Sequence, residues 1–133
     1  MKALTLIQPW ATLIMLGEKQ IETRSWNTKY RGKLAIHAGK KIDKTVFDSP
    51  YYKEVFAKYN ITPKNIPTSC IIAYCDLDDT KSTEELVGIV SDKEKCFGDY
   101  SSNRFGWILK NIIPITPPIP AKGMLGLWEF ENN

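Results

Sequence analysis

The sequence of 133 residues contains no long apolar segment and only three cysteines. Its longest uncharged stretch near the start, residues 4–17, includes Gln8 and Pro9 and is too short to span a bilayer. The first ten residues lack the apolar core and the small-residue cleavage site of a signal peptide. We therefore expect a cytoplasmic protein with no membrane contact. The odd cysteine count argues against a disulfide framework and favours buried, reduced thiols.

Motifs for common enzyme mechanisms and for metal binding are also missing. The sequence has no Gly-x-Ser-x-Gly nucleophile motif, no glycine loop that would cradle a phosphate and no His-Glu-x-x-His zinc motif. Three thiols and the single His37 would suffice for one zinc ion, but Cys70 and Cys75 have four residues between them and lie within an apolar run, which is not a short knuckle spacing. We predict no metal site and no cofactor. No period of 20 to 50 residues recurs, which excludes repeat architectures.

Positive charge is concentrated in the first half of the chain. The net charge is only +3, but residues 1–68 contain 12 Lys and Arg against 5 Asp and Glu, while residues 69–133 contain 6 against 10. Residues 19–44 alone contain 8 basic against 2 acidic side chains. Such a segment creates a local positive field that attracts phosphates, unless it is an ordinary solvated lysine surface. Trp26 and Tyr30 within it favour nucleic acid, because aromatic rings stack on single-stranded bases.

The composition, 43% hydrophobic and 25% charged, is typical of one compact domain over residues 1–133. Apolar spacing, with Gly and Pro at the boundaries, predicts an α+β domain built around a small β-barrel with flanking helices. The predicted helices cover about residues 9–16 and 51–59, and the predicted strands cover residues 2–7, 20–26, 33–38, 69–77, 105–115 and 126–130. An acidic turn is expected at residues 78–82, irregular chain at 92–104 and an extended segment at 114–120.

Candidate chemistry clusters in residues 17–26. Strand alternation places Glu22 and Arg24 on one side, about 7 Å apart, and Lys19 enters from the preceding turn. A plain salt-bridge cluster is the structural alternative. If the cluster lines a concavity, Glu22 would accept a hydrogen bond from a base amino group, while Lys19 and Arg24 would hold a phosphate or a carbonyl oxygen. His37, between small residues on the next strand, is of a kind that is more often structural than catalytic.

Several short motifs follow one another in order through nearly the whole chain. They are Gln8-Pro9-Trp10-Ala11, Gly17-x-Lys19-x-x-Glu22-x-Arg24-x-Trp26, Arg31-Gly32-x-Leu34-x-Ile36-His37-Ala38, Phe97-Gly98-Asp99-Tyr100, Arg104-Phe105-Gly106-Trp107-x-Leu109, Pro118-Ile119-Pro120 and Gly126-Leu127-Trp128. Each motif alone is weakly specific, but their combined order and spacing resembles the activating signal cointegrator homology (ASCH) domain.

The resemblance implies a PUA-like fold, which is a small β-barrel with flanking helices, and an association with RNA and modified bases. It places the ligand cleft beside the first helix and the segment of residues 19–26. The ligand-binding residues that it nominates, with Lys40 added from the basic segment, are Gln8, Trp10, Lys19, Glu22, Arg24, Trp26, His37 and Lys40.

Some small relatives of the family resemble amidohydrolases of N4-acylated cytidine, with a Gly-x-Lys-x-x-Thr-x-Arg motif whose lysine and threonine are catalytic. This sequence keeps Lys19 and Arg24 but has Glu22 in the place of that threonine, and alternation directs Thr23 to the opposite face. The expected nucleophile is therefore missing. Metal-dependent ribonuclease activity is also found within the family, but the sequence has no carboxylate cluster that indicates a metal site.

The leading expectation is a module that binds RNA, another single-stranded nucleic acid or a modified nucleoside, with RNA preferred to DNA, through a basic cleft beside the first helix. The alternative is a hydrolase of an N4-acylated cytidine amide or of RNA phosphodiesters, with Lys19 and Glu22 as the acid–base pair. A protein-interaction domain with a residual pocket is the third reading.

Overall fold

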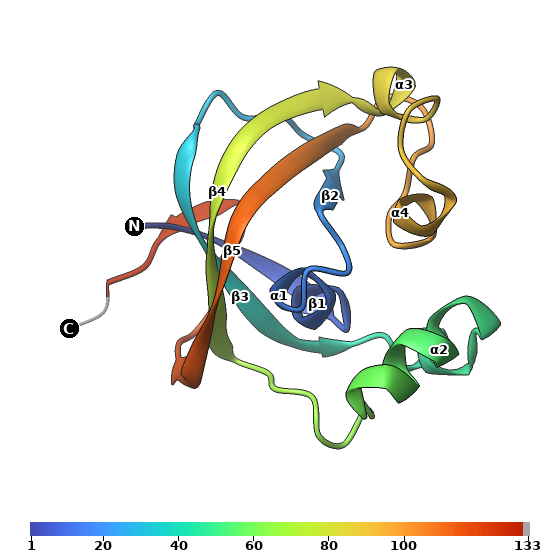
Figure 1. The fold of residues 1–133 in the computed structure, drawn as a ribbon. Helices are drawn as coiled ribbons and strands as arrows, with labels where there is room; N and C mark the ends of the chain where they lie inside the picture. The colour runs from blue at the N-terminus through green and yellow to red at the C-terminus, as the bar shows by residue number, and fades with distance from the viewer. Residues whose placement is uncertain (132–133) are drawn as a thin grey trace.

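The computed structural model describes residues 1–131 and contains one curved six-stranded sheet, with one short helix inside its curve and the other helices to one side (Figure 1). The strand order is β2-β5-β4-β3-β1-β6, with β1 parallel to β3 and the other neighbouring pairs antiparallel. The elements are β1 (Lys2–Gln8), α1 (Trp10–Met15), β2 (Ile21–Arg24), β3 (Gly32–Ile42), the 3-10 helix η1 (Lys44–Asp48), α2 (Pro50–Tyr59), β4 (Cys70–Ser82), α3 (Thr83–Leu86), α4 (Asp92–Cys96), β5 (Phe105–Pro120) and β6 (Leu127–Glu129). Within residues 1–131, no helix is long and apolar enough to cross a membrane.

The helix boundaries follow local signals in the sequence. Helix α1 begins directly after Pro9, and Gly17 closes it in the left-handed conformation with φ +77°. Helix α2 has Pro50 in its first turn, where the missing N–H costs nothing. Both helices are therefore confirmed. The chain at residues 92–96, expected to be irregular, forms α4 instead, because the Ser91 hydroxyl accepts a hydrogen bond from an N–H of its first turn.

Strands β4 and β5 are longer than the spacing of apolar residues predicts. Residues 78–82, expected as an acidic turn, continue β4, and residues 79–82 pair with residues 105–108 of β5. Residues 114–120, expected to run extended, do so as the second half of β5 and pair with residues 70–73. The turn expected at residues 78–82 is therefore wrong, whereas the extended segment is confirmed. Each segment looks like a loop by composition, but its partner strand satisfies its backbone N–H and C=O groups.

The sheet is strongly curved but does not close into the expected barrel. Its edges are β2, which pairs with β5, and β6, which pairs with residues 2–4 of β1. The two edge strands contain only four and three residues, so neither extends far enough to hydrogen-bond the other. Among the residues described, the second half of β1, residues 5–8, has a strand on one side only. Such an edge leaves backbone carbonyls to be satisfied by side chains or ligands.

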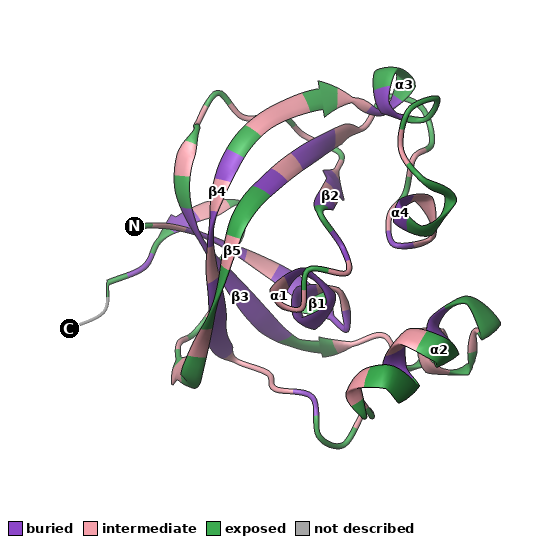
Figure 2. Ribbon diagram, viewed as in Figure 1, coloured by how far each residue is buried: buried purple, intermediate pink, exposed green. Residues whose placement is uncertain are grey.

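The hydrophobic core lies inside the curve of the sheet, around α1 (Figures 1 and 2). Leu4 and Leu6 of β1 and Trp107 of β5 are at most 1% exposed. Trp26, which follows β2, packs edge-on against Trp107 with the ring centroids 4.8 Å apart. An aromatic pair in this geometry contributes about 0.5–1.5 kcal/mol beyond the buried area. The pair therefore fastens the end of β2 to the core.

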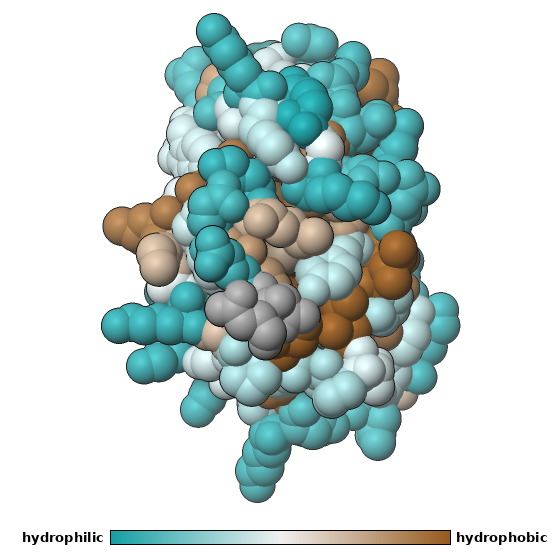
Figure 3. All heavy atoms as spheres, turned by 90° about the vertical axis from the view of Figure 1, so that its left-hand side faces the viewer, coloured by the Kyte–Doolittle hydropathy of each residue, from teal (hydrophilic) through white to brown (hydrophobic). Residues whose placement is uncertain are grey.

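Some hydrophobic side chains lie outside the core. Ile113, Met124 and Leu125 are all more than half exposed. Figure 3 views the side of the molecule that carries the chain termini and shows hydrophobic surface between hydrophilic side chains. Single exposed apolar side chains are normal in folded proteins, so they bear on function only where a cavity adjoins them.

Candidate functional site

A cavity of about 450 Å³ opens at the unpaired edge of β1, between β1, α1, β2 and the segment of residues 96–104. We call it the β1–β2 cavity. It is lined by Thr5, Ile7, Trp10, Glu22, Thr23, Arg24, Tyr52, Cys96, Phe97, Gly98, Asp99 and Arg104. Its volume lies within the range of roughly 300–1,000 Å³ that is usual for sites that bind small molecules.

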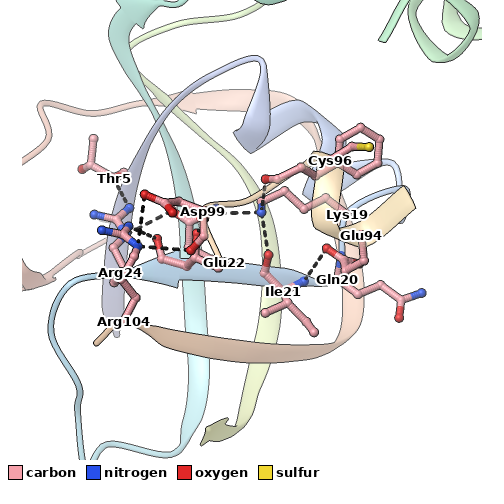
Figure 4. Close-up of polar contacts among 12 residues, drawn as sticks. Thr5, Lys19, Gln20, Ile21, Glu22, Arg24, Glu94, Cys96, Asp99 and Arg104 are labelled. Carbon is pink, nitrogen blue, oxygen red and sulfur yellow. Dashed lines mark hydrogen bonds and ion pairs between the residues drawn. The ribbon is translucent and has the colours of Figure 1, made fainter. Parts of the chain in front are cut away.

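Arg24 spans the gap that the open sheet leaves between β2 and β1 (Figure 4). Its Nη2 donates a hydrogen bond to the backbone oxygen of Thr5 at 2.8 Å, and its Nε donates to Glu22 Oε2 at 3.0 Å. Glu22 and Arg24 lie on the same side of β2, as strand alternation predicts, and their side chains are 13% and 23% exposed. The guanidinium thus takes the place of the missing strand pairing, and a charge-assisted bond of this kind contributes about 1.5–3 kcal/mol.

Lys19 is directed into the protein by the way α1 ends. The N–H of Glu18 donates to Leu13 O at 3.0 Å and the N–H of Gly17 donates to Ile14 O at 2.9 Å, which is the Schellman pattern. The N–H of Lys19 also reaches Leu13 O, at 3.1 Å. The chain therefore turns back beneath the helix before β2 begins.

The Lys19 ammonium is buried behind the cavity rather than exposed within it. Its Nζ donates to Ile21 O at 2.5 Å and to Phe97 O at 2.6 Å, and it lies 3.6 Å from Glu22 Oε1. Burial lowers the pKa of Lys19, and the neighbouring Glu22 carboxylate opposes this shift. Because the ammonium donates hydrogen bonds to both β2 and Phe97, it links two walls of the cavity.

The segment of residues 91–104 forms the wall opposite β1 and is fastened to β2 along its length. Glu94 accepts hydrogen bonds from the N–H groups of Gln20, at 2.9 Å, and Ile21, at 3.3 Å. The Asp99 N–H donates to Thr23 Oγ1 at 2.9 Å. Side chains and backbone of β2 therefore hold the position of the wall, and the cavity is formed before any ligand arrives.

Charged groups of both signs meet in the cavity. Arg104 Nε donates to the backbone oxygen of Asp99 at 3.1 Å and lies 3.5 Å from its Oδ2. With Glu22 and Arg24, the walls carry two guanidinium groups and two carboxylates, so the charges balance locally. Trp10 adds an aromatic side chain. The arrangement offers a small molecule several hydrogen-bond donors, several acceptors and apolar surface in one place.

The comparisons with known proteins agree with this architecture. The family model for the ASCH domain matches residues 4–119. The chain belongs to the ASCH domain family. It is 30% identical to Activating signal cointegrator 1 of Mus musculus over 138 aligned residues and to the protein of the same name in Homo sapiens over 137, with 97% of this chain covered in both cases. The chain spans about a fifth, 22%, of the length of these curated relatives.

Solved structures support the fold of this ASCH domain. The crystal structure of ASCH from Zymomonas mobilis superposes with a TM-score of 0.55 at 15% sequence identity, covering 90% of this chain and 72% of that chain. A Y47F mutant of the same protein gives a TM-score of 0.53, also at 15% identity, with 90% and 74% covered. The predicted α+β class is confirmed and the PUA-like fold is supported, with the difference that the sheet stays open.

The residues that the sequence nominates in this ASCH domain fall into separate places. Trp10, Glu22 and Arg24 line the β1–β2 cavity, and Lys19 lies directly behind them. Gln8 is fully buried. Its amide group bonds the N–H and hydroxyl of Thr12 and donates to a backbone oxygen of the loop before β4, so it holds the start of α1 in place.

The remaining three nominated residues lie outside the β1–β2 cavity. Trp26 packs against Trp107 in the core. His37 and Lys40, both on β3, line a second cavity of about 700 Å³ on the other side of Thr5. The nominated set therefore does not form one site, because alternation along a strand does not show which of the two faces adjoins which cavity.

The lining residues that sequence reasoning did not nominate include Tyr52, Asp99 and Arg104. Tyr52 comes from α2, and its hydroxyl donates to the backbone oxygen of Cys96. Asp99 and Arg104 belong to two of the C-terminal motifs on which the resemblance rests, which was the signal that could have found them. Their hydrogen-bond partner on β2 lies some 80 residues earlier in the sequence.

Proposed function

We propose that this chain binds single-stranded nucleic acid, RNA in preference to DNA, by taking one base or modified base into the β1–β2 cavity. One observation carries the proposal. A preformed cavity of about 450 Å³ combines aromatic side chains with two guanidinium groups and two carboxylates. Proteins that read single-stranded RNA hold unstacked bases in this way, on aromatic or guanidinium planes and through hydrogen bonds to the base edges.

The four charged side chains have different parts in this proposal. Within residues 1–131, Arg24 donates two of its five N–H groups to Glu22 and Thr5, which leaves donors for a base carbonyl or a ring nitrogen. Glu22 and Asp99 are acceptors suited to an exocyclic amino group. The local charges balance, so hydrogen bonding to the base, rather than net attraction, supplies the selectivity of this cavity.

Binding is favoured over the hydrolytic alternative by the position of Lys19. A general acid or base must come within hydrogen-bond reach of the reacting group. The Lys19 side chain is only 1% exposed, and its ammonium already donates to two backbone carbonyls. Glu22 faces the cavity, but without Lys19 the acid–base pair that the hydrolase requires is incomplete. We therefore assign Lys19 a supporting role behind the binding surface.

Binding can be measured by titrating the protein with nucleosides, N4-acetylcytidine included, and with short single-stranded RNA and DNA, using calorimetry. The test variant is Arg104→Gln, and the matched control is Arg31→Gln, because both arginines pair with one aspartate and Arg31 lies outside the cavity. Loss of one charge-assisted hydrogen bond to the ligand weakens binding about tenfold or more. The control should bind as the wild type does.

Two results would contradict the proposal. Equal affinity of Arg104→Gln and Arg31→Gln, with both variants folded by circular dichroism, would place the ligand elsewhere. Conversion of N4-acetylcytidine or cleavage of RNA, detected by mass spectrometry and lost on substitution of Lys19, would make the chain a hydrolase. Binding without any new product is the expected result.

A further inference from the structure

The second cavity lies on the outer face of β1 and β3 and has a different chemical character. Strand alternation directs Leu4 and Leu6 into the core, so Thr5 and Ile7 face outward. The cavity of about 700 Å³ above this face is bounded by β3 and by the chain that leads from β5 to β6. We call it the β1–β3 cavity. Its lining includes the two lysines Lys40 and Lys122 and no carboxylate.

The two cavities share Thr5 as a common wall. The backbone oxygen of Thr5 accepts the hydrogen bond from Arg24 in the β1–β2 cavity, and its hydroxyl faces His37 in the β1–β3 cavity. Ile7, which is 39% exposed and lies on the same face of β1 as Thr5, lines the β1–β2 cavity. A ligand that occupies one cavity can therefore reach the other by passing over a single strand.

A chain of hydrogen bonds fixes the floor of the β1–β3 cavity. Trp128 Nε1 donates to Thr5 Oγ1 at 3.0 Å, and Thr5 Oγ1 lies 3.1 Å from His37 Nδ1. His37 Nε2 lies 2.7 Å from the backbone oxygen of Ala121, which can only accept, so Nε2 carries a proton. His37 thus joins β1 to the chain before β6, which is the structural role that a lone histidine more often has.

Glycine is required where the segment that leads from β5 to β6 crosses the floor of the β1–β3 cavity. A Cβ atom on Gly123 would lie 2.6 Å from Thr5 Oγ1 and 2.8 Å from His37 Cε1, closer than a Cβ atom approaches other non-bonded atoms. The backbone at Gly123 is therefore packed directly against the two side chains. The neighbouring Met124 and Leu125 are 62% and 98% exposed and stand at the rim of the cavity. The cavity has a rigid polar floor, an apolar rim and two cationic side chains.

We propose that the β1–β3 cavity binds the phosphate and sugar next to the base held in the β1–β2 cavity, so that the ligand is a strand of at least two nucleotides rather than a free nucleoside. This inference rests on the proposed function. Lys40 and Lys122 form no ion pair with any residue in the described range 1–131, and lysine binds phosphate as a compact point charge. The exposed Leu125 offers apolar surface to a second base.

The inference predicts that loss of the two lysines weakens the binding of oligonucleotides but not the binding of nucleosides. The test protein carries Lys40→Gln and Lys122→Gln. The control carries Lys33→Gln and Lys110→Gln, because these lysines are 69% and 59% exposed, pair with aspartates and lie outside both cavities. The probes are the four ribonucleosides and the four homopolymeric RNA pentamers, titrated by calorimetry at several salt concentrations.

We expect the test protein to bind nucleosides as the wild type does and to bind the best pentamer at least tenfold more weakly. Loss of two phosphate contacts to a single strand should reduce the slope of log affinity against log salt by about 1.4. The control should leave both quantities unchanged.

The outcomes separate this inference from the function on which it rests. If the wild type binds a nucleoside but gains nothing from a pentamer, or if test and control proteins bind the pentamer equally, the β1–β3 cavity is not a nucleotide subsite while the β1–β2 site stands. If the wild type binds neither these pentamers nor any nucleoside, N4-acetylcytidine included, the proposed function itself is wrong. A pentamer that binds with an affinity independent of salt also overturns the role of the two lysines.

Discussion

Replacing Lys19 by methionine tests whether its ammonium holds the walls of the β1–β2 cavity together. Methionine fills similar space but cannot donate, so Ile21 O and Phe97 O both lose the hydrogen bonds that they receive at 2.5 and 2.6 Å. A buried acceptor left without its donor costs about 1–3 kcal/mol. Glu22 also loses one of its two cationic neighbours but keeps Arg24 at 3.0 Å.

The net effect is smaller than the sum of these losses, because removing a buried charge also removes its cost of desolvation. We expect Lys19→Met to lower the free energy of unfolding by about 3 kcal/mol. For a chain of this length, that loss lowers the melting temperature by roughly 10 °C. The control is Lys33→Met, because the Lys33 side chain is 69% exposed and its ammonium lies 3.9 Å from Asp76. An exposed pair contributes less than about 1 kcal/mol.

Urea denaturation followed by circular dichroism measures both variants against the wild type. The reasoning is refuted if Lys19→Met costs no more than Lys33→Met, because the buried ammonium would then contribute nothing that a methionine cannot replace. Hydrogen exchange gives a second check. The amides of residues 96–99 should exchange faster in Lys19→Met, since their wall loses its link to β2.

Two further predictions concern the titratable groups of Glu18 and of the cysteines. Hydrogen bonds from Lys93 and the Tyr59 hydroxyl lower the pKa of Glu18 to about 2, so the stability that its charge provides is complete above pH 4.5 and is lost as the pH falls toward 2. Between about pH 5 and pH 2, the free energy of unfolding measured with urea should fall by about 1 kcal/mol more in the wild type than in Glu18→Gln. An equal fall in the two proteins would contradict this prediction. Burial raises the pKa of the Cys75 thiol to about 12, while Cys96 is partly exposed. Iodoacetamide at pH 8 should therefore label Cys96 first, and Cys75 only after unfolding; equal labelling rates, measured by mass spectrometry, would show that the core opens.

The candidate site could be predicted from the sequence only in part. Strand alternation correctly places Glu22 and Arg24 side by side, because this periodicity depends on the local backbone alone. Lys19 belongs to the same motif, but its burial follows from the turn that ends α1 and from the approach of Phe97, which lies 78 residues further along the chain. Arg104, which is also distant from β2 in the sequence, lines the cavity because of the same tertiary packing.

The sequence by itself determined the α+β class, both predicted helices and the pairing of Glu22 with Arg24, since apolar spacing, helix-ending residues and strand alternation act over a few residues. Only the tertiary structure decided that the sheet stays open and that Arg24 spans the gap to β1. It also divided the nominated residues between two cavities, on either side of Thr5. These features depend on where short edge strands stop and on contacts between distant segments, which no local pattern encodes.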